Sequence, residues 1–394
     1  MPPRFALDDE IGRELDAIEE RGLLRRLRTI DGAQDAVVRV DGRDAVLLCS
    51  NNYLGLASHP EVVEAAARAT RNYGASAVSS RLISGHMRPH ALLEEKIAAW
   101  KGVDAALLWS TGYHANIGVI SSLVGPGDAV VSDELNHASI IDGCRLSRAR
   151  VAVYRHNDVD SLHEALASCA DARRILVVTE SVFSMDGDLA PLAAIADAAE
   201  AHGAWLMVDE AHAAGIFGPA GAGLVAEKGL TSRIDVHMGT LGKALASFGA
   251  YVAGSHRLIE HLINRARPFI FTTGLPPSAA AAASAALDII AREPGRAFRL
   301  LENARSLGLR LREAGLRVPN VESQILPVVV GDARRAVAAA AALLERGYYV
   351  AAIRPPTVPD GTSRLRLSLM ATHQEEHIDG VAAALVEILG ETAQ

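Results

Sequence analysis

A chain of 394 residues is longer than one hydrophobic core usually serves, so we expect a large domain and a smaller one. The formal net charge of −8 excludes the basic surface that binds nucleic acid, and an apolar fraction of 49% excludes a disordered chain. No apolar run approaches the ~18 residues of a membrane span, and residues 1–5 lack the apolar stretch of a signal peptide, so no membrane partner is expected.

The N-terminal residues predict a helix followed by a β-hairpin. Apolar residues at helical spacing indicate an amphipathic helix over residues 8–30. Its basic cluster at 25–28 has an ordinary explanation, because cations favour helix C-termini. Two mostly apolar runs, at 37–40 and 45–49, flank an Asp-Gly turn and predict the hairpin. An irregular polar loop is expected over 50–56.

Beyond this loop, apolar strands alternate with helical segments. Helices are predicted from Pro60 and over 90–101. Strands are predicted at 105–109, 129–131, 151–154, 175–179, 205–208 and 235–238, with a return strand at 249–254. The strands end in polar loops, and this alternation indicates an α/β fold with a mostly parallel sheet and a site at the strand ends.

One of these strand ends has the pattern of an anion site. The strand at 105–109 runs into Ser110–Asn116, a glycine turn that precedes an apolar helix. Backbone N–H groups and the helix dipole converge at such a point and attract an anion such as phosphate. The glycine patterns of Walker and Rossmann sites are absent from the sequence.

The C-terminal third predicts a second, smaller α+β domain. An Ala-rich helix over 278–291 leads to strands at 325–330, 348–353 and 365–369 and to a last helix. We therefore divide the chain into an N-terminal segment (1–55), a large domain (56–285) and a C-terminal domain (286–394).

Neither the histidines nor the cysteines indicate a metal. His373 and His377 are four residues apart, but no third ligand is nearby, and Thr372–Glu375 is typical of a helix capping box. The cysteines, Cys49, Cys144 and Cys169, are odd in number and lack metal-ligand spacing. We expect buried thiols in a reducing compartment, and hence a cytoplasmic protein.

Lys243 stands apart from the other lysines. The chain has four lysines among its 39 basic residues, and three of them, Lys96, Lys101 and Lys228, lie in polar patterns that predict solvated charges. Lys243 is flanked by Gly, Ala, Leu and Phe. An apolar setting disfavours the ammonium form and lowers the pKa of the amine, which is what a Schiff-base lysine needs.

Asp209 is the natural partner of such a lysine. It follows the apolar run Trp205–Val208, at the tip of a predicted strand, and His212 comes three residues later. A strand-end aspartate is often only a helix cap. A pyridoxal phosphate site, however, needs an acid for the ring nitrogen and a lysine for the aldehyde. Asp209 and Lys243 together therefore predict pyridoxal 5'-phosphate as the cofactor.

Four motifs resemble those of a known family. They are Asn136–Ser139, Thr179–Gly187, Val208–His212 and Thr240–Lys243. The chain is similar, from Arg25 to about His373, to the α-oxoamine synthases, which are pyridoxal-phosphate enzymes that condense an amino acid with an acyl-CoA and release CO2. The resemblance implies the fold type I, aspartate-aminotransferase-like fold, with a mostly parallel sheet in the large domain and an α+β C-terminal domain.

The resemblance implies a role for each matched residue. Lys243 would hold the cofactor and move the α proton, Asp209 would keep the ring nitrogen protonated, and His137 would stack on the ring. The other implied cofactor contacts are His212 and Ser184 at the phenolic oxygen, Gly112, Tyr113 and Thr240 at the phosphate, and Thr272 and Thr273 at a neighbouring subunit's phosphate. The implied substrate residues are Arg25 for the acyl donor, Arg366 for the carboxylate, and Asn51, His137 and Thr357. Arg366 also has an ordinary explanation as an alternating charge on a strand, although its planar fork suits a carboxylate.

One stretch distinguishes branches within the family. Ala352–Leu367, with its Arg354-Pro355-Pro356 run, is similar to the branch that makes 8-amino-7-oxononanoate from alanine and a pimeloyl thioester in biotin synthesis. A glycine-using relative such as 2-amino-3-oxobutyrate CoA ligase, or an aminotransferase, is the alternative. The implied partners are an amino acid and an acyl thioester, carried by CoA or by an acyl-carrier protein, and the implied assembly is a homodimer with shared sites.

Overall fold

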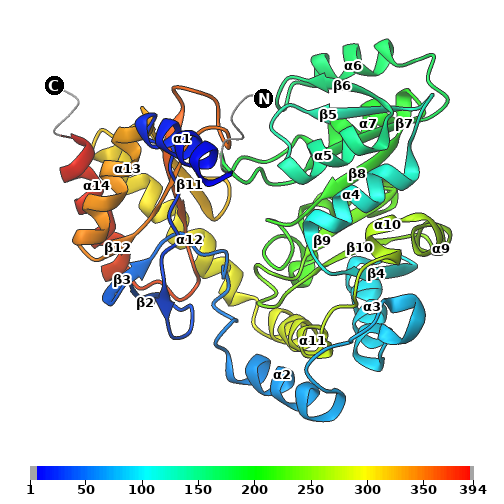
Figure 1. Cartoon of the computed structure of the whole chain (residues 1–394), viewed down its shortest axis with the longest axis horizontal. Coiled ribbons are helices and arrows are strands. Elements are labelled where there is room, and N and C mark those ends of the chain that lie inside the picture. Colours follow the sequence, from blue (N-terminus) through cyan, green and yellow to red (C-terminus); the bar gives the residue numbers. More distant parts are fainter. Residues whose placement is uncertain (1–6, 391–394) are drawn as a thin grey trace, which may run out of the picture. The chain divides into compact units, whose positions relative to one another are not determined.

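The computed structural model describes residues 7–390, which divide into two compact units. Among the described residues, unit 1 comprises residues 7–50, 185–187 and 300–390, and unit 2 comprises residues 51–184 and 188–299. Figure 1 gives the order of the elements along the chain. No helix within residues 7–390 combines the length and apolarity needed to cross a bilayer.

Unit 2 is built on the predicted sheet. Its strands, among the described residues, are β4 (Ala105–Trp109), β5 (Ala129–Asp133), β6 (Arg150–Tyr154), β7 (Ile175–Glu180), β8 (Trp205–Asp209), β9 (Val236–Thr240) and β10 (Ala250–Gly254). They are ordered β4-β10-β9-β8-β7-β5-β6. The strands from β9 to β6 are parallel, and β10 runs antiparallel to both of its neighbours. The mostly parallel sheet predicted from the alternation is confirmed.

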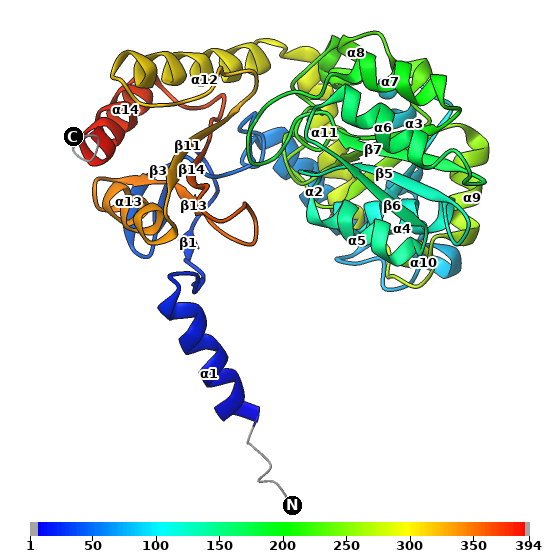
Figure 2. The ribbon, with the colours of Figure 1, turned by 90° about the horizontal axis from the view of Figure 1, so that it is seen from above.

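Helices cover both faces of this sheet, because strands that are apolar on both sides need two covering layers. Figure 2 shows α6 (Val159–Ser168) and α7 (Leu192–Ala201) on one side, and α4 (Gly112–Leu123) and α5 (Ala138–Ser147) on the other. The remaining helices of unit 2 are α2 (Pro60–Tyr73), α3 (Arg88–Lys101), α8 (Leu224–Glu227), α9 (His256–Arg265), α10 (Arg267–Ile270) and α11 (Pro277–Arg292). A core between the strands and the α4 layer includes Trp109, Val119, Ile140, Val178 and Met207.

Unit 1 contains two small sheets. One is ordered β1-β2-β3-β12, from β1 (Ile30–Asp31), the predicted hairpin β2 (Val37–Val40) and β3 (Arg43–Leu47), and β12 (Tyr348–Tyr349). The other is antiparallel and ordered β11-β14-β13, from β11 (Ile325–Gly331), β14 (Ser363–Ser368) and β13 (Ala351–Ile353). The helices are α1 (Leu7–Glu20), most of α12 (Gly295–Glu313), α13 (Ala333–Glu345) and α14 (Glu375–Gly390).

The predicted N-terminal helix is shorter than expected. The helix α1 ends at Glu20 rather than at residue 30, because Gly22 takes a φ of 69° and its N–H bonds to the Glu19 carbonyl. The chain then runs without helix to residue 29. Arg354 holds it there by donating to the Gly22 carbonyl at 2.6 Å. A contact from Arg354, which follows β13, therefore competes with local helical periodicity.

Two other local interpretations are wrong. Lys101 is not a solvated charge, because its side chain is buried and forms an ion pair with Glu210. The capping box at Thr372–Glu375 does not form, since α14 begins at Glu375 itself and the Thr372 hydroxyl is buried without a partner. Instead, His377 Nδ1 accepts the Gln374 N–H at 3.2 Å, before the helix starts.

Candidate active site

Asp209 ends β8, where it is buried in unit 2. The Asp209 carboxylate accepts the Asn116 side-chain N–H at 2.9 Å on one oxygen and the Ala211 backbone N–H at 2.9 Å on the other. Asn116 comes from α4, and it also bonds to the Ser139 hydroxyl at 2.9 Å. Two donors from different elements therefore fix the orientation of the carboxylate.

Lys243 belongs to a hydrogen-bonded network that reaches the loop before α2. Its Nζ lies 2.8 Å from His212 Nε2, and His212 Nδ1 lies 2.7 Å from the Tyr53 hydroxyl. Tyr53 donates to Asn51 Oδ1 at 2.9 Å. If Tyr53 donates to Asn51, His212 Nδ1–H donates to Tyr53 and Nε2 accepts from Lys243. Lys243 is half-buried between the buried Leu241 and Ala244, so the side chain is not fully desolvated.

His137 lies at the start of α5, where the residue is exposed to solvent while its ring Nδ1 faces the buried Ser139. Its Nδ1 lies 2.8 Å from the Ser139 hydroxyl, which connects it through Asn116 to Asp209. Burial lowers the pKa of His137, while the nearby Asp209 charge opposes this shift and Lys243 adds to it. A neutral imidazole at neutral pH follows from the lowered pKa.

Glu180 is a further acid at these strand ends. It is buried at the end of β7, in register with Asp209 on β8, and it accepts the His137 backbone N–H at 2.6 Å. Burial and the Asp209 charge raise the pKa of Glu180 to about 8. Glu180 is therefore largely protonated at pH 7.

The N-terminus of α4 is the place where the sequence predicts an anion site. Gly112 and Tyr113 are its first two residues, and Thr111 caps it by accepting the His114 N–H at 3.1 Å. A side chain at Gly112 would collide with Thr240, because an added Cβ would lie 2.8 Å from Thr240 Cγ2. Thr240 Oγ1 is buried without a hydrogen-bond partner. A hydroxyl in that state, beside the first N–H groups of a helix, marks a place where a ligand oxygen fits.

Ser184, Thr272 and Thr273 lie on two loops of unit 2. Ser184 is buried in the loop between β7 and α7, where an isolated bridge pairs Val182 with Leu189. Thr272 and Thr273 follow α10, and the Thr273 carbonyl accepts the Ser110 hydroxyl at 3.1 Å.

Three predicted substrate residues belong to unit 1. Arg366 is buried in the central strand β14 and donates to the Ser368 hydroxyl at 2.7 Å. Arg25 is exposed and donates to the Pro355 carbonyl at 3.1 Å, which places it beside the Arg-Pro-Pro run. Thr357 is exposed, and its N–H bonds to the Arg354 carbonyl at 3.0 Å.

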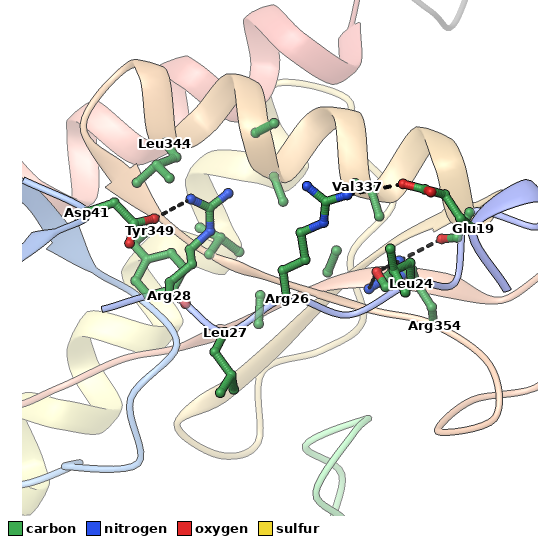
Figure 3. Close-up of a pocket in the computed structure, with 16 residues that line it drawn as sticks. Glu19, Leu24, Arg26, Leu27, Arg28, Asp41, Val337, Leu344, Tyr349 and Arg354 are labelled. Carbon is green, nitrogen blue, oxygen red and sulfur yellow. Dashed lines mark hydrogen bonds and ion pairs between the residues drawn. The ribbon is translucent and has the colours of Figure 1, made fainter. Parts of the chain in front are cut away.

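A groove of about 680 Å³ lies in unit 1. Figure 3 shows the residues that line it. The segment that contains Arg26 and Arg28 forms one wall, and α13 forms another with Val337 and Leu344. Arg26 pairs with Glu19 at 3.2 Å, and Arg28 pairs with Asp41 at 2.8 Å. Arg25 itself is not one of the residues that line this groove.

The predicted site residues thus fall into two sets. The unit 2 set comprises Asn51, Gly112, Tyr113, His137, Ser184, Asp209, His212, Thr240, Lys243, Thr272 and Thr273, and the unit 1 set comprises Arg25, Thr357 and Arg366. Within residues 7–390, no three His, Cys, Asp or Glu side chains gather in a way that could hold a metal ion.

The sequence analysis assigned no role to Tyr53, Asn116 or Glu180. A lone Asn in an apolar helix was a weak signal for Asn116. Glu180 could have been found by the signal that identified Asp209, since it is also an acid at the end of an apolar strand. Nothing local indicates the contact between Tyr53 and His212, which are 159 residues apart in the chain.

Comparison with known proteins agrees with this arrangement. Residues 43–385 match the family described as aminotransferase class I and II. The 8-amino-7-oxononanoate synthase of Anaeromyxobacter dehalogenans (strain 2CP-1 / ATCC BAA-258) is 56% identical over 97% of this chain and 96% of its own length. That of Geobacter sulfurreducens is 52% identical over 96% and 97%.

Solved structures of related proteins superpose over nearly the whole chain. A variant serine palmitoyltransferase from S. paucimobilis with a bound PLP–myriocin aldimine has a TM-score of 0.92 at 34% identity, over 98% of this chain and 99% of that one. An 8-amino-7-oxononanoate synthase from Francisella tularensis has a TM-score of 0.75 at 27% identity, over 88% and 97%. The chain has the fold type I architecture predicted from the resemblance, and it belongs to the aminotransferase class I and II family and, within it, to the α-oxoamine synthases.

Proposed function

We propose that this chain catalyses the 8-amino-7-oxononanoate synthase reaction, in which L-alanine and a pimeloyl thioester give 8-amino-7-oxononanoate, CO2 and the free thiol carrier. The observation that carries the proposal is the network joining Lys243, His212 and Asn51 at the strand ends, in a chain 56% identical to such an enzyme. The product is an intermediate of biotin synthesis.

The residues of unit 2 fit pyridoxal 5'-phosphate, which we propose as the cofactor. The unpartnered Thr240 hydroxyl and the first N–H groups of α4, at Gly112 and Tyr113, would bind the phosphate. His212 and Ser184 would bond to the phenolic oxygen. When bound, the cofactor withdraws electrons from the α carbon of the amino acid through its protonated ring.

Each charged residue then has a task set by its environment. The Lys243 amine would hold the aldehyde carbon and move the proton at the α carbon of the substrate. The Asp209 carboxylate, oriented by Asn116 and by the Ala211 N–H, would keep the ring nitrogen protonated. His137, neutral because burial lowers its pKa, would lie against the ring face.

The substrate residues complete the proposal. Arg366 is a buried guanidinium, and its planar fork suits a carboxylate. Arg25 would meet the acyl donor, with Asn51, His137 and Thr357 lining the substrate site. The Arg25 side chain donates a hydrogen bond to the Pro355 carbonyl, within the Arg-Pro-Pro run. The residue proposed to bind the acyl donor therefore contacts the stretch that distinguishes the family branches.

The test is an assay of thiol release with crossed panels of substrates. Purified protein with added cofactor is mixed with alanine, glycine or serine, and with pimeloyl, acetyl, succinyl or palmitoyl thioesters of CoA and of an acyl-carrier protein. We expect release of thiol and CO2 with alanine and a pimeloyl donor, and little with the other pairs. Serine with a palmitoyl donor is the pair named by the structural relatives, so preference for it, or for glycine, would overturn the substrate assignment.

We also propose that the protein is a homodimer with shared sites. The Thr272–Thr273 loop is joined to a neighbouring loop by a bridge between Thr273 and Ser80. Large apolar side chains on these two loops are exposed, among them Phe271 at 71% and Val78 at 85%. Exposed apolar side chains that cluster on adjoining loops favour a protein interface.

A cytoplasmic location is part of the same proposal. Cys49, Cys144 and Cys169 are all free thiols in the structure. Burial raises the pKa of Cys49 to about 12 and that of Cys144 to about 11, so neither is a reactive thiolate. Buried, unpaired thiols are typical of proteins from a reducing compartment.

A further inference from the structure

A histidine outside the predicted site lies between two carboxylates at the same sheet edge. His156 follows β6, and its Nδ1 is 2.9 Å from Asp133 Oδ1. Its Nε2 is 2.7 Å from Asp188 Oδ2. An ionised carboxylate only accepts hydrogen bonds, so both ring nitrogens must carry hydrogen. With both carboxylates ionised, the two contacts are those of an imidazolium.

The surroundings of His156 support the charged form. Burial alone would lower the pKa of His156, but the hydrogen bonds and charges of Asp133 and Asp188 raise it to about 10. Among the other charged groups nearby, Glu134 accepts the His156 backbone N–H at 2.9 Å. Arg155 pairs with Asp158 rather than with either carboxylate of His156. The Phe183 ring packs edge-on against the imidazole, with its centroid 4.3 Å away.

On one side, this cation is fixed to the start of the His137 loop. Asp133 ends β5, and its side chain is 0% exposed. It also accepts the Leu135 N–H at 2.9 Å and the Asn157 N–H at 3.0 Å. His137 follows four residues after Asp133, so the carboxylate that receives His156 Nδ1 also shapes the turn leading to His137.

On the other side, the cation is fixed to the end of the Ser184 loop. Asp188 also accepts the Asn157 side-chain N–H at 2.8 Å. The Asp188 carbonyl accepts the Phe183 N–H at 3.0 Å, which closes the loop at the residue before Ser184. Displacement of Asp188 would therefore displace Phe183 and Ser184.

We propose that His156, held as an imidazolium between Asp133 and Asp188, is a positioning residue that ties the Ser184 loop to the strand end from which the His137 loop starts. The proposal rests on the proposed function only for the roles of Ser184 and His137. The tie itself concerns the protein alone and is measurable without cofactor or substrate.

The test uses His156→Gln, with His163→Gln as the matched control. Glutamine is uncharged, and both of its N–H donors are on one nitrogen, whereas the imidazolium donates to the two carboxylates from two separate ring nitrogens. His163 is an exposed histidine on α6. Its Nδ1 lies 3.3 Å from Nε2 of another histidine, His202, rather than from a carboxylate. In the apoprotein we expect amide exchange at Phe183 to become roughly tenfold faster in His156→Gln, and exchange in the other sheet strands to change little.

Two further readouts separate positioning from general support. After correction for the intrinsic pH dependence of exchange, wild-type protection at Phe183 is expected to fall as the pH rises through about 10, with no such step in His156→Gln. The variant should also bind pyridoxal 5'-phosphate several-fold more weakly in an absorbance titration. Uniformly faster exchange in all strands would mean a purely structural role and would overturn the proposal.

A second variant covers the case in which His156→Gln does not fold, since it leaves the buried Asp133 charge without its cation. Asp188→Ala keeps the His156–Asp133 pair and releases only the loop. We expect faster exchange at Phe183 in this variant too, and unchanged exchange there would refute the tie. If wild-type protein instead shows the tie but releases no thiol in the substrate assay, the function fails and the positioning role stands.

Discussion

At the residue scale, Lys243 is tested by its own removal. We expect purified protein to absorb in the visible, and Lys243→Ala to lose that band and all turnover, because only an amine can hold the cofactor aldehyde. Borohydride reduction followed by peptide mapping should place the cofactor on Lys243.

Lys228→Ala is the matched control, since Lys228 is 51% exposed and pairs only loosely with Glu227, at 3.5 Å. It should keep both the band and the activity. A Lys243→Ala protein that still yields a reduced adduct, at another lysine, would show that the assignment is wrong.

Asp209 is tested by an isosteric change. Asp209→Asn keeps a group of the same shape between Asn116 and the Ala211 N–H but removes the charge that favours a protonated ring nitrogen. We expect the cofactor to remain bound and kcat to fall by far more than tenfold. Retention of about a tenth of the activity, which is a barrier change of only ~1.4 kcal/mol, would mean that another group protonates the ring.

Glu180 has a pH signature of its own. Its pKa is raised from 4.5 to about 8 in the folded protein, so the folded state binds more protons than the unfolded state between these values. Stability linked to Glu180 is therefore complete below pH ~4.5 and is lost as the pH rises toward 8.

Glu180→Gln has no proton to lose at this position. As the pH rises through this window, the unfolding free energy of the wild type should therefore fall relative to that of the variant. Urea unfolding of both apoproteins at several pH values measures the difference. A constant difference from pH 5 to pH 9 would show that Glu180 does not titrate as its raised pKa of about 8 requires.

At the element scale, the turn after β8 is held by a buried ion pair. Lys101 is the last residue of α3, and its amine contacts the Glu210 carboxylate and the Ala222 carbonyl. Glu210 also accepts the Val225 N–H at 2.9 Å. Glu210 directly follows Asp209. The pair therefore connects this position to the end of α3, to the loop at Ala222 and to α8 at Val225.

Removing one partner of this pair is expected to be costly. Lys101→Met leaves a buried charge on Glu210 without its cation, for which the typical loss is about 3–5 kcal/mol. The same change at Lys96, whose side chain is 31% exposed and pairs with Asp288, should cost under ~1 kcal/mol. The double variant Lys101→Met, Glu210→Gln should recover part of the loss. Equal unfolding free energies for the Lys101 and Lys96 variants would contradict this account.

At the scale of the whole molecule, the proposed shared sites predict complementation between inactive chains. Lys243→Ala lacks the amine, and a chain with Thr272→Ala and Thr273→Ala lacks the donors that the partner's phosphate would need. When the two are mixed and allowed to exchange subunits, one of the two sites in each hybrid has every wild-type part, so activity should return.

The controls are the two homodimers, each of which should stay inactive, and mass measurement of the hybrid. Absence of any recovery with the hybrid present would count against shared sites. A monomeric mass at the working concentration would remove the dimer itself.

The sheet was predictable from the sequence, and the sequence also singled out Asp209 and Lys243 as the centre of the proposed site. Strands covered on both faces are apolar throughout, so β5, β7 and β8 are visible as short apolar runs, and a polar residue just after such a run must lie at the sheet edge. Asp209 was predicted because it is an acid that ends such a run. Lys243 was predicted because a lysine among apolar neighbours is unusual, and both signals are local in the sequence.

Only the tertiary structure decided which distant groups meet these residues. The Lys101 side chain is buried because Glu210, 109 positions away, supplies its counter-charge, and no local pattern contains that information. Likewise α1 ends at Glu20 because Arg354 holds the following segment, and Tyr53 reaches His212 across 159 residues. Hydrogen bonds and ion pairs are set by distances in space, whereas periodicity reports only whether a residue faces the core or the solvent.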